Sequence, residues 1–254
     1  MKNILSIMLL AGLLIGCKEK AKNQDEESTA SPNMESTMNT SEENEWTVLF
    51  DGTSFDGWHV YPGKEVPDAW KLEDGAMILR PEEARTDGNR FNMVTDNEYT
   101  DFVLSLEWMV NEGANSGIMW GVVEDPKYAE PYYTGPEIQV LDNINHPDAK
   151  NGTTHQAGAL YDMVAPSADV VKPIGEWNTY EITINHKTNE GIVVLNGTKI
   201  VEFPVTGEGW ETMVANSKFA DWEAFGKYQT GKIALQDHGE NISIGYRNIK
   251  LKEL

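Results

Sequence analysis

The chain lacks a second cysteine, and basic residues are scarce. Cys17 is the one cysteine among 254 residues, and 20 Lys and Arg stand against 41 Asp and Glu, which gives a formal net charge of −21. A lone cysteine excludes a disulfide framework within the chain. The excess of acid, without any cluster of Lys or Arg, argues against nucleic acid as a partner, because phosphate backbones are bound by basic patches.

Long apolar runs are also missing. The most apolar stretch lies at residues 4–15, after Lys2, and is shorter than the ~20 residues of a spanning helix. It therefore predicts a signal peptide at residues 1–17. Leu-Ile-Gly-Cys, ending at Cys17, resembles the lipobox of bacterial lipoproteins and implies lipidation of this cysteine. We expect a lipid-anchored protein of the cell envelope, on the outer membrane or its periplasmic face, with no other membrane contact.

Residues 18–45 contain no aromatic residue and no β-branched aliphatic residue. Such a segment buries too little apolar surface to offset its chain entropy, which predicts a disordered acidic tether. The composition changes abruptly at Trp46. Because all-β domains of about 200 residues are common, we expect a single domain at residues 46–254.

Helical periodicity is nearly absent from this domain. Only residues 210–225 space their apolar side chains at roughly helical intervals. Short runs of β-type composition are separated instead by Gly, Asn and Asp, and Asn196-Gly197 fits a type I′ hairpin turn. About eleven strands with one or two short helices predict an all-β, jelly-roll sandwich. The expected strands are residues 46–50, 75–79, 91–95, 102–110, 117–123, 137–141, 158–163, 179–186, 191–203 with the hairpin turn inside, 231–236 and 242–251.

Strand parity gathers polar side chains on the faces of several strands. Glu137 and Gln139 share one face of the strand at 137–141, and a bulge after Val140 would add Asp142. Gln236 and His238 share a face in the same way, opposite Leu235. Glu107 points away from the apolar side of its own strand. Paired carboxylates on one strand are typical of retaining glycosidases. The stretch resembles the Glu-x-Asp-x-x-Glu strand motif of jelly-roll β-glucanases, but Gln139 stands in place of the central acid.

Aromatic and metal-binding patterns give weaker indications. Trp120 and Tyr161 lie beside glycines and are candidates for a sugar-binding cleft. The acids and amides between Asp142 and Asp148 lack the spacing of an EF-hand loop. The sequence contains no His-x-x-His or Glu-x-x-His array, which would predict a zinc site. We therefore assign no metal ligand from the sequence.

A series of short motifs runs through the domain in order, from WTVLFDGTSFDGW to YRNI. They lie at residues 46–58, 115–118, 135–143, 158–161, 175–178, 195–197, 217–219, 231–239 and 246–249. Together they resemble the 3-keto-disaccharide hydrolase domain family of bacteria. The resemblance covers essentially all of residues 46–254 and implies a concanavalin-like jelly roll. It also implies a carbohydrate substrate whose 3-hydroxyl has been oxidised to a ketone by a separate sugar 3-dehydrogenase.

A ketone at C3 acidifies the hydrogen on C2, so one base can start an elimination that expels the group on C1, and water can then add. Glu137 or His238 is our candidate base, with the other beside the leaving oxygen and Glu107 as a reserve carboxylate. The candidate ligands of the sugar and its oxyanion are Asn115, Trp120, Gln139, Asp142, Tyr161, Gln236 and Arg247. No cofactor is assigned, and assistance of the enolate by a divalent cation stays open.

Three other functions stay open at this point, and the simplest is an interaction scaffold on the cell envelope. A lectin-like module would hold glycans in the same aromatic cleft without cleaving them. A conventional retaining β-glucanase would cleave unoxidised sugars through a covalent intermediate on Glu137.

Overall fold

The computed structural model describes residues 45–81 and 88–254. The predicted signal peptide, Cys17 and nearly all of the predicted tether lie outside these residues. Among the residues described, no helix is long and apolar enough to cross a membrane.

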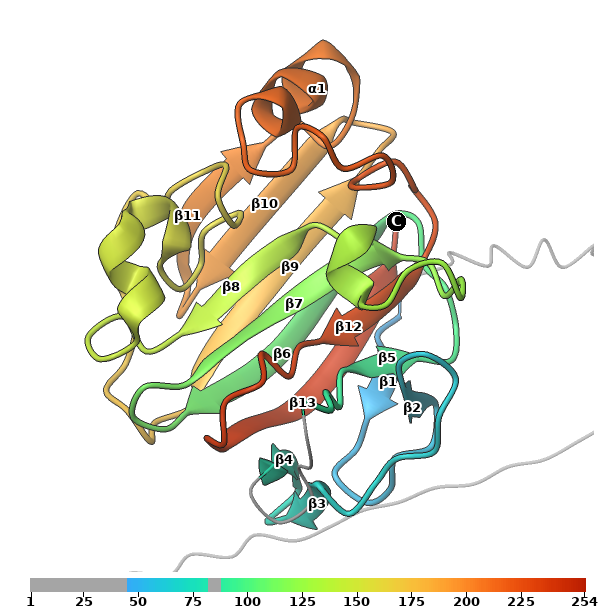
Figure 1. Cartoon of the computed structure of the whole chain (residues 1–254), viewed down its shortest axis with the longest axis vertical. Helices are drawn as coiled ribbons and strands as arrows, with labels where there is room; N and C mark the ends of the chain where they lie inside the picture. Colours follow the sequence, from blue (N-terminus) through green and yellow to red (C-terminus); the bar gives the residue numbers. More distant parts are fainter. Residues whose placement is uncertain (1–44, 82–87) are drawn as a thin grey trace, which may run out of the picture. The chain divides into compact units, whose positions relative to one another are not determined.

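Two antiparallel sheets form the domain (Figure 1). The larger has eight strands, in which β1 (Thr47–Phe50) pairs with β13 beside the main path. That path runs β11 (Thr198–Phe203), β10 (Glu190–Leu195), β9 (Asn178–Asn185), β6 (Phe102–Val110), β13 (Ile244–Glu253), β4 (Ala76–Leu79) and β3 (Trp70–Glu73). The smaller sheet has the order β2 (Trp58–Val60), β5 (Met93–Thr95), β12 (Lys232–Leu235), β7 (Asn115–Val122) and β8 (Glu137–Leu141).

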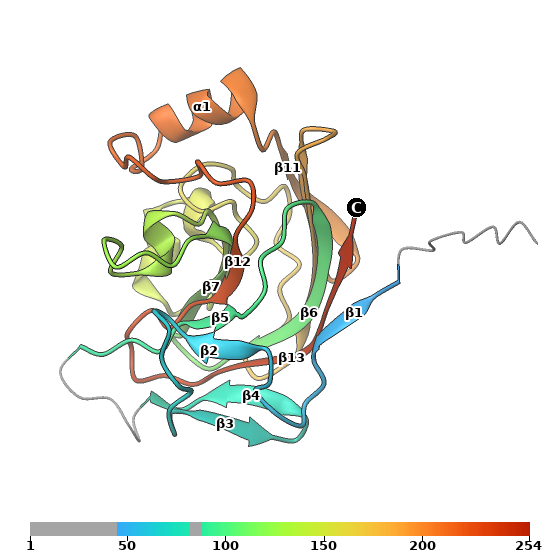
Figure 2. The same ribbon diagram turned by 90° about the vertical axis from the view of Figure 1, so that its right-hand side faces the viewer.

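The two sheets pack face to face around one core, as the edge-on view in Figure 2 shows. β6 alternates buried and partly buried residues along its whole length, and its buried side chains meet Ile138 and Val140 of β8 in the core cluster. This alternation is what a strand with one face on a core requires. The prediction of an all-β jelly-roll sandwich is confirmed.

Local backbone conformation explains where the element predictions succeed and fail. Asn196 and Gly197 both have positive φ, 49° and 81°, and join β10 to β11 as the I′ turn requires. Residues 158–163 were expected to form a strand but make only isolated bridges at Leu160. Gly158 and Asp162, at φ 89° and 62°, break the extended backbone on both sides of that bridge.

The helix α1 spans Gly207–Ala215, so the helix predicted at residues 210–225 begins earlier and ends much sooner. After Asn216 the chain forms turns that bring Phe219, Trp222 and Phe225 together. Their apolar spacing therefore reflects an aromatic cluster and not a helical face. Three 3₁₀ helices complete the elements that concern the site: η2 (Pro131–Tyr133), η3 (Pro147–Asn151) and η4 (Thr153–His155).

Candidate functional site

A pocket lies on the face of the smaller sheet that points away from the core. Strand β8 contributes Glu137 and Gln139, β7 contributes Asn115, and the segment after β12 contributes Gln236 and His238. All five were predicted from strand parity or resemblance, and the fold brings them together. The remaining lining residues come from the loops over this sheet: Arg90, Tyr132, Gly135, Tyr161, Lys218, Phe219, Trp222 and Phe225.

Glu137 occupies the floor of this pocket. Its carboxylate lies over Gly117 of β7, where any side chain would collide with it. In the orientation that satisfies its amide, Gln139 donates to Glu137 Oε1 at 3.2 Å and to the Ser116 carbonyl at 2.7 Å. Burial raises the pKa of Glu137 to about 7, although the nearby charges of His238 and Lys218 and a hydrogen bond from Gln236 act to lower it. A carboxyl group with this pKa can exchange a proton near neutral pH.

Glu137 is the only carboxylate that lines the pocket within the described part of the chain. The predicted second carboxylate, Asp142, does not join it, because the β7–β8 register continues without a bulge to Leu141. Asp142 instead accepts from the backbone N–H groups of Gly113, Ile144 and Asn145, at 2.7–3.1 Å. Burial opposes its charge, but these bonds hold its pKa below the usual range. Asp142 therefore shapes the loop after β8.

Two amide oxygens in the pocket have no hydrogen-bond partner. They are Asn115 Oδ1 and Gln236 Oε1, and their residues are only 3% and 4% exposed. A buried acceptor without a donor is costly. These oxygens therefore suit a ligand that presents hydroxyl groups.

Tyr161 forms one wall of the pocket and begins a chain of polar groups behind it. Its hydroxyl donates to Asp148 Oδ2 at 2.8 Å. The ring of His155 lies between Asp148 and Asp162, with nitrogen–oxygen distances of 2.9 and 3.0 Å. Burial, together with the Asp148 bond, raises the pKa of Tyr161, and Lys218 Nζ lies 4.1 Å from the centre of its ring. Since the phenol proton is committed to Asp148, the oxygen can accept a hydrogen bond from a ligand hydroxyl.

An aromatic wall faces this polar floor. Trp222 packs against Tyr132 and Phe219 at ring distances of 6.0 and 5.1 Å, and such faces are suited to sugar rings. Trp120, predicted for the cleft, is buried in the core and packs 5.9 Å from Phe203. The prediction for Trp120 is wrong, because Trp120 shares the inward face of β7 with Ile118.

Glu107 and Arg247 lie elsewhere, which corrects the expectation that they share the cleft. They sit opposite each other on β6 and β13 of the larger sheet. Arg247 donates to Glu107 Oε2 through Nε at 2.8 Å, and its guanidinium lies 4.2 Å from the centre of the Trp177 ring. Glu107 does point away from the core, as parity predicted. Parity does not tell which of the two outer faces of a sandwich a residue occupies.

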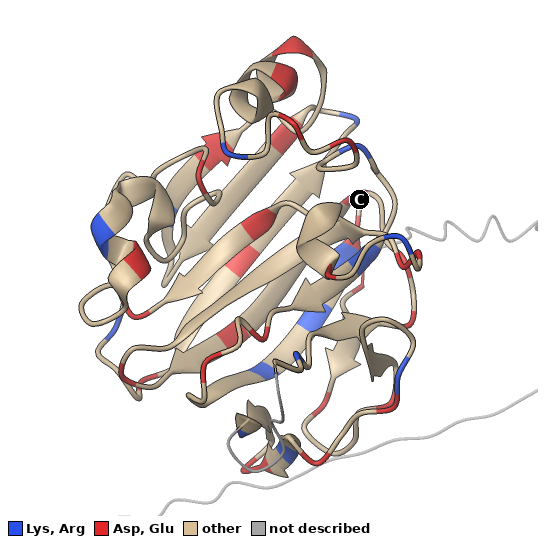
Figure 3. Ribbon diagram, viewed as in Figure 1, with Lys and Arg blue, Asp and Glu red and all other residues tan. Residues whose placement is uncertain are grey.

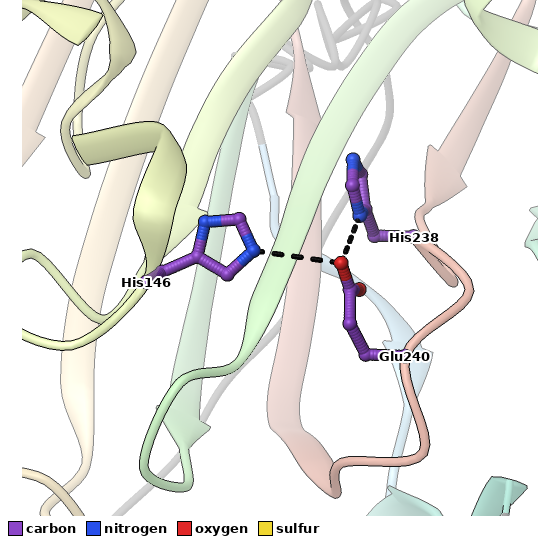
Figure 4. A group of neighbouring side chains, drawn as sticks. All are labelled: His146, His238 and Glu240. Carbon is purple, nitrogen blue, oxygen red and sulfur yellow. Dashed lines mark hydrogen bonds and ion pairs between the residues drawn. The ribbon is translucent and has the colours of Figure 1, made fainter. Parts of the chain in front are cut away.

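Beside the pocket, His238 is part of a cluster that the sequence did not indicate. Its Nδ1 lies 2.7 Å from Glu240 Oε1, and His146 Nε2 lies 3.5 Å from the same oxygen. Figure 4 shows both rings directed toward the carboxylate. His146 follows β8 while Glu240 follows β12, so only the pairing of both strands with β7 brings them together.

Comparison with known proteins gives consistent results. The sequence profile of the 3-keto-alpha-glucoside-1,2-lyase-like domain matches residues 45–252. A protein of Bacteroides thetaiotaomicron named 3-keto-disaccharide hydrolase is 32% identical over 98% of this chain and 97% of its own length. The crystal structure of a putative glycosyl hydrolase from Parabacteroides distasonis has a TM-score of 0.73 at 31% identity, over 82% of this chain and 94% of that chain. A second such structure from the same organism has a TM-score of 0.62 at 25% identity, over 83% and 100%.

Proposed function

Because the chain belongs to the 3-keto-alpha-glucoside-1,2-lyase-like domain family, we propose that it cleaves the glycosidic bond of 3-keto-glycosides, with Glu137 as the base. Cleavage of a glycoside agrees with the names of the similar hydrolase and of the putative glycosyl hydrolases. The proposal goes beyond these names in two respects: the substrate carries a ketone at C3, and the glycosidic bond breaks by elimination.

The observation that carries the proposal is the single carboxylate lining the pocket. Retaining glycosidases use two carboxyl groups about 5 Å apart, and inverting enzymes use two at roughly 6.5–9.5 Å. Among the lining residues described, Glu137 has no acidic partner. An elimination next to a ketone needs one base and no carboxylate nucleophile.

The steps use groups that the pocket provides. Glu137 removes the C2 proton, and the electrons of the C–H bond form an enolate whose charge rests on the C3 oxygen. As the ketone reforms, a C1–C2 double bond forms and the C1–oxygen bond breaks, so the aglycone departs with its electron pair and takes up a proton. Water added across the double bond would give the free 3-keto sugar. Lys218 supplies a cation in the pocket that can stabilise the developing negative charge, and His238 lines the same pocket.

Substrate binding follows from the remaining lining groups. The unpartnered oxygens of Asn115 and Gln236 accept from sugar hydroxyls, as does the hydroxyl oxygen of Tyr161. Trp222 supplies an apolar face for the ring. The ketone itself must be made by a separate sugar 3-dehydrogenase, since the proposed reaction begins from an already oxidised ring.

The test replaces Glu137 by glutamine, which keeps the shape of the side chain but is not a base. We expect aglycone release from a 3-keto-glucoside to fall by roughly 10²–10⁴-fold, and exchange of the C2 hydrogen with deuterated solvent to fall with it. Tyr133→Phe, a conservative change beside the pocket, is the control. Full activity of Glu137→Gln would rule out the assigned base. Cleavage of an unoxidised glucoside at a similar rate would rule out the keto requirement.

The location is a separate part of the proposal. Its support is the sequence ending at Cys17, which resembles a lipobox. We propose that the domain is held at the cell envelope by a lipid on Cys17, with residues 18–45 as the tether.

A further inference from the structure

The cluster of two histidines and one glutamate beside the pocket has the composition of a metal site. Each of His146, His238 and Glu240 offers one ligand atom, and these atoms lie within 4.8 Å of one another. We propose that the three side chains bind one divalent first-row transition-metal ion at the side of the pocket. Figure 4 shows the three side chains converging from two different segments.

The ligand types and their spacing favour such an ion. Two imidazoles and one carboxylate suit zinc, iron and neighbouring metals, whereas magnesium and calcium prefer oxygen ligands. Bonds of about 2.0–2.2 Å place neighbouring ligand atoms roughly 3.0–3.5 Å apart. The distances from Glu240 Oε1 to His238 Nδ1 and His146 Nε2, 2.7 and 3.5 Å, need only small adjustment. Three protein ligands leave coordination positions open for a substrate.

A simple ion-pair cluster is the competing explanation, and the other histidines show what that looks like in this protein. His59 contacts Asp96 and Glu124, and His155 contacts Asp148 and Asp162. In each case two carboxylates surround one ring. At Glu240 the ratio is reversed, because two rings converge on one carboxylate oxygen. Two imidazolium ions so close together would repel each other, whereas neutral rings can share a cation.

The neighbouring bonds of His146 show what metal binding must change. Its Nδ1 accepts from the backbone N–H of Asp148 at 3.1 Å, which leaves the proton on Nε2. To bind a cation through Nε2, the ring must carry its proton on Nδ1, and the bond to Asp148 must open. One neutral hydrogen bond contributes little compared with coordination of a metal ion by several side chains. The start of η3 should therefore shift when the ion binds.

A second, independent observation points to a ligand next to this cluster. Gln236 N donates to the Gly117 carbonyl at 2.9 Å, which keeps the segment that leads to His238 beside β7, the strand of Asn115. His238 and Asn115 both line the pocket. The buried Asn115 Oδ1 has no donor, so a hydroxyl or a water held by the ion would satisfy it. The open coordination positions of the ion therefore face the pocket.

The role of the ion rests on the proposed function, although the existence of the site does not. A cation at the side of the pocket can bind the C3 ketone oxygen and a neighbouring hydroxyl of the sugar. It would withdraw electrons from the ketone and stabilise the enolate oxygen formed when Glu137 removes the C2 proton. Among the lining residues that the structure describes, Lys218 and Arg90 are the basic side chains that could assist it.

The experiment measures metal binding directly. The mature protein is treated with chelator, dialysed, and titrated calorimetrically with Zn²⁺, Mn²⁺ and Co²⁺ salts. We expect one ion per chain for at least one of these metals, and a weakening of about 100-fold or more in Glu240→Gln and in His146→Ala. His59→Gln, which alters a histidine of another cluster, should bind like the wild type. Thermal melting of each variant establishes that it is folded.

A second readout needs no substitution. The visible spectrum of the wild-type protein with Co²⁺ should differ from that of the aqueous ion in the way expected for nitrogen ligands. Absence of stoichiometric binding by the wild type, or equal binding by all variants, would overturn the site. If the ion binds but no 3-keto-glycoside is cleaved, the proposed function fails and the site stands. If the ion binds but cleavage persists at the full rate without it, the role of the ion in catalysis fails, while the site and the function stand.

Discussion

The side chain of Glu137 is buried, yet it must carry a negative charge to act as the proposed base. Its carboxylate is buried at the floor of the pocket, where the amides of Gln139 and Gln236 and the charges of His238 and Lys218 offset only part of the lost hydration. A base must be ionised to act, so the reaction proposed for this protein uses the form that the folded state tolerates least. Active sites commonly carry such a cost in stability.

The cost predicts a dependence of stability on pH. The pKa of Glu137 rises from 4.5 to about 7 on folding, so below pH 4.5 the folded and unfolded states are both protonated and nothing is lost. Between about pH 4.5 and 7 the unfolded state loses its proton first, and folding becomes less favourable by roughly 3 kcal/mol. Glu137→Gln removes this effect. In the presence of chelator its melting temperature should match that of the wild type at pH 4 and exceed it at pH 8 by on the order of 10 °C.

One result would contradict the predicted pH dependence of the melting temperatures. Equal differences between variant and wild type at both pH values would mean that the carboxylate is not destabilised by burial. Tyr133→Phe, which removes no group that titrates between pH 4 and 8, controls for general effects of pH on the fold.

The sequence predicted individual site residues only as far as strand parity reaches. Glu137 and Gln139, and likewise Gln236 and His238, were paired correctly, because alternation in a strand is a local property. Glu107 was not, because the choice between two outer faces depends on the packing of the whole sandwich. His146 lies in a loop among several polar residues, and nothing local distinguishes it from a solvated side chain.

At the scale of elements, β7 determines where the base can lie. It is the strand between β8 and β12, and Gly117 is the position at which the Glu137 side chain crosses it. Gly117 has no positive φ, unlike Gly121 of the same strand. Its lack of a side chain therefore serves the carboxylate and not the backbone.

A methyl group at Gly117 should displace Glu137 without unfolding the strand. We expect Gly117→Ala to lower kcat/KM by about 100-fold, since a misplacement of about 1 Å is enough, with little change in melting temperature. In the Glu137→Gln background the same substitution should have almost no further effect on kcat/KM. This double-mutant cycle separates the two roles. Losses that simply multiply would show that Gly117 acts independently of Glu137.

The element predictions were best where the turn chemistry was explicit. The β10–β11 hairpin was predicted from Asn196-Gly197 and is present. The aromatic residues at 219–225 were predicted as helical because a compact cluster and a helical face give similar spacing. The short strands β2 and β3 were missed, since three or four residues carry too little pattern.

At the scale of the whole molecule, the net charge bears on how the protein could be attached to a membrane. Figure 3 shows Asp and Glu spread over α1, the loops and several strands, with Lys and Arg between them. The chain as a whole has a net charge of −21, so an anionic membrane surface offers it no electrostatic attraction. The attachment to the envelope that we propose would therefore come from the lipid on Cys17.

Replacing Cys17 by serine should release the protein. Expressed in a bacterium that processes lipoproteins, the wild type should appear in the membrane fraction and incorporate a labelled fatty acid. Cys17→Ser should do neither. High salt should not extract the wild type, while detergent should, because the attachment is hydrophobic. Equal partitioning of the two proteins would exclude the anchor.

The two unpartnered oxygens of Asn115 and Gln236 also affect which sugars the pocket rejects. A sugar that lacks a hydroxyl at either position, or carries an ether there, would exclude water from the oxygen and give it no donor in return. Sites that must hydrogen-bond a hydroxyl discriminate against analogues without it far more strongly than apolar pockets discriminate by size. If the proposed function is right, deoxygenated and O-alkylated sugars would thus be excluded through the bond they fail to make.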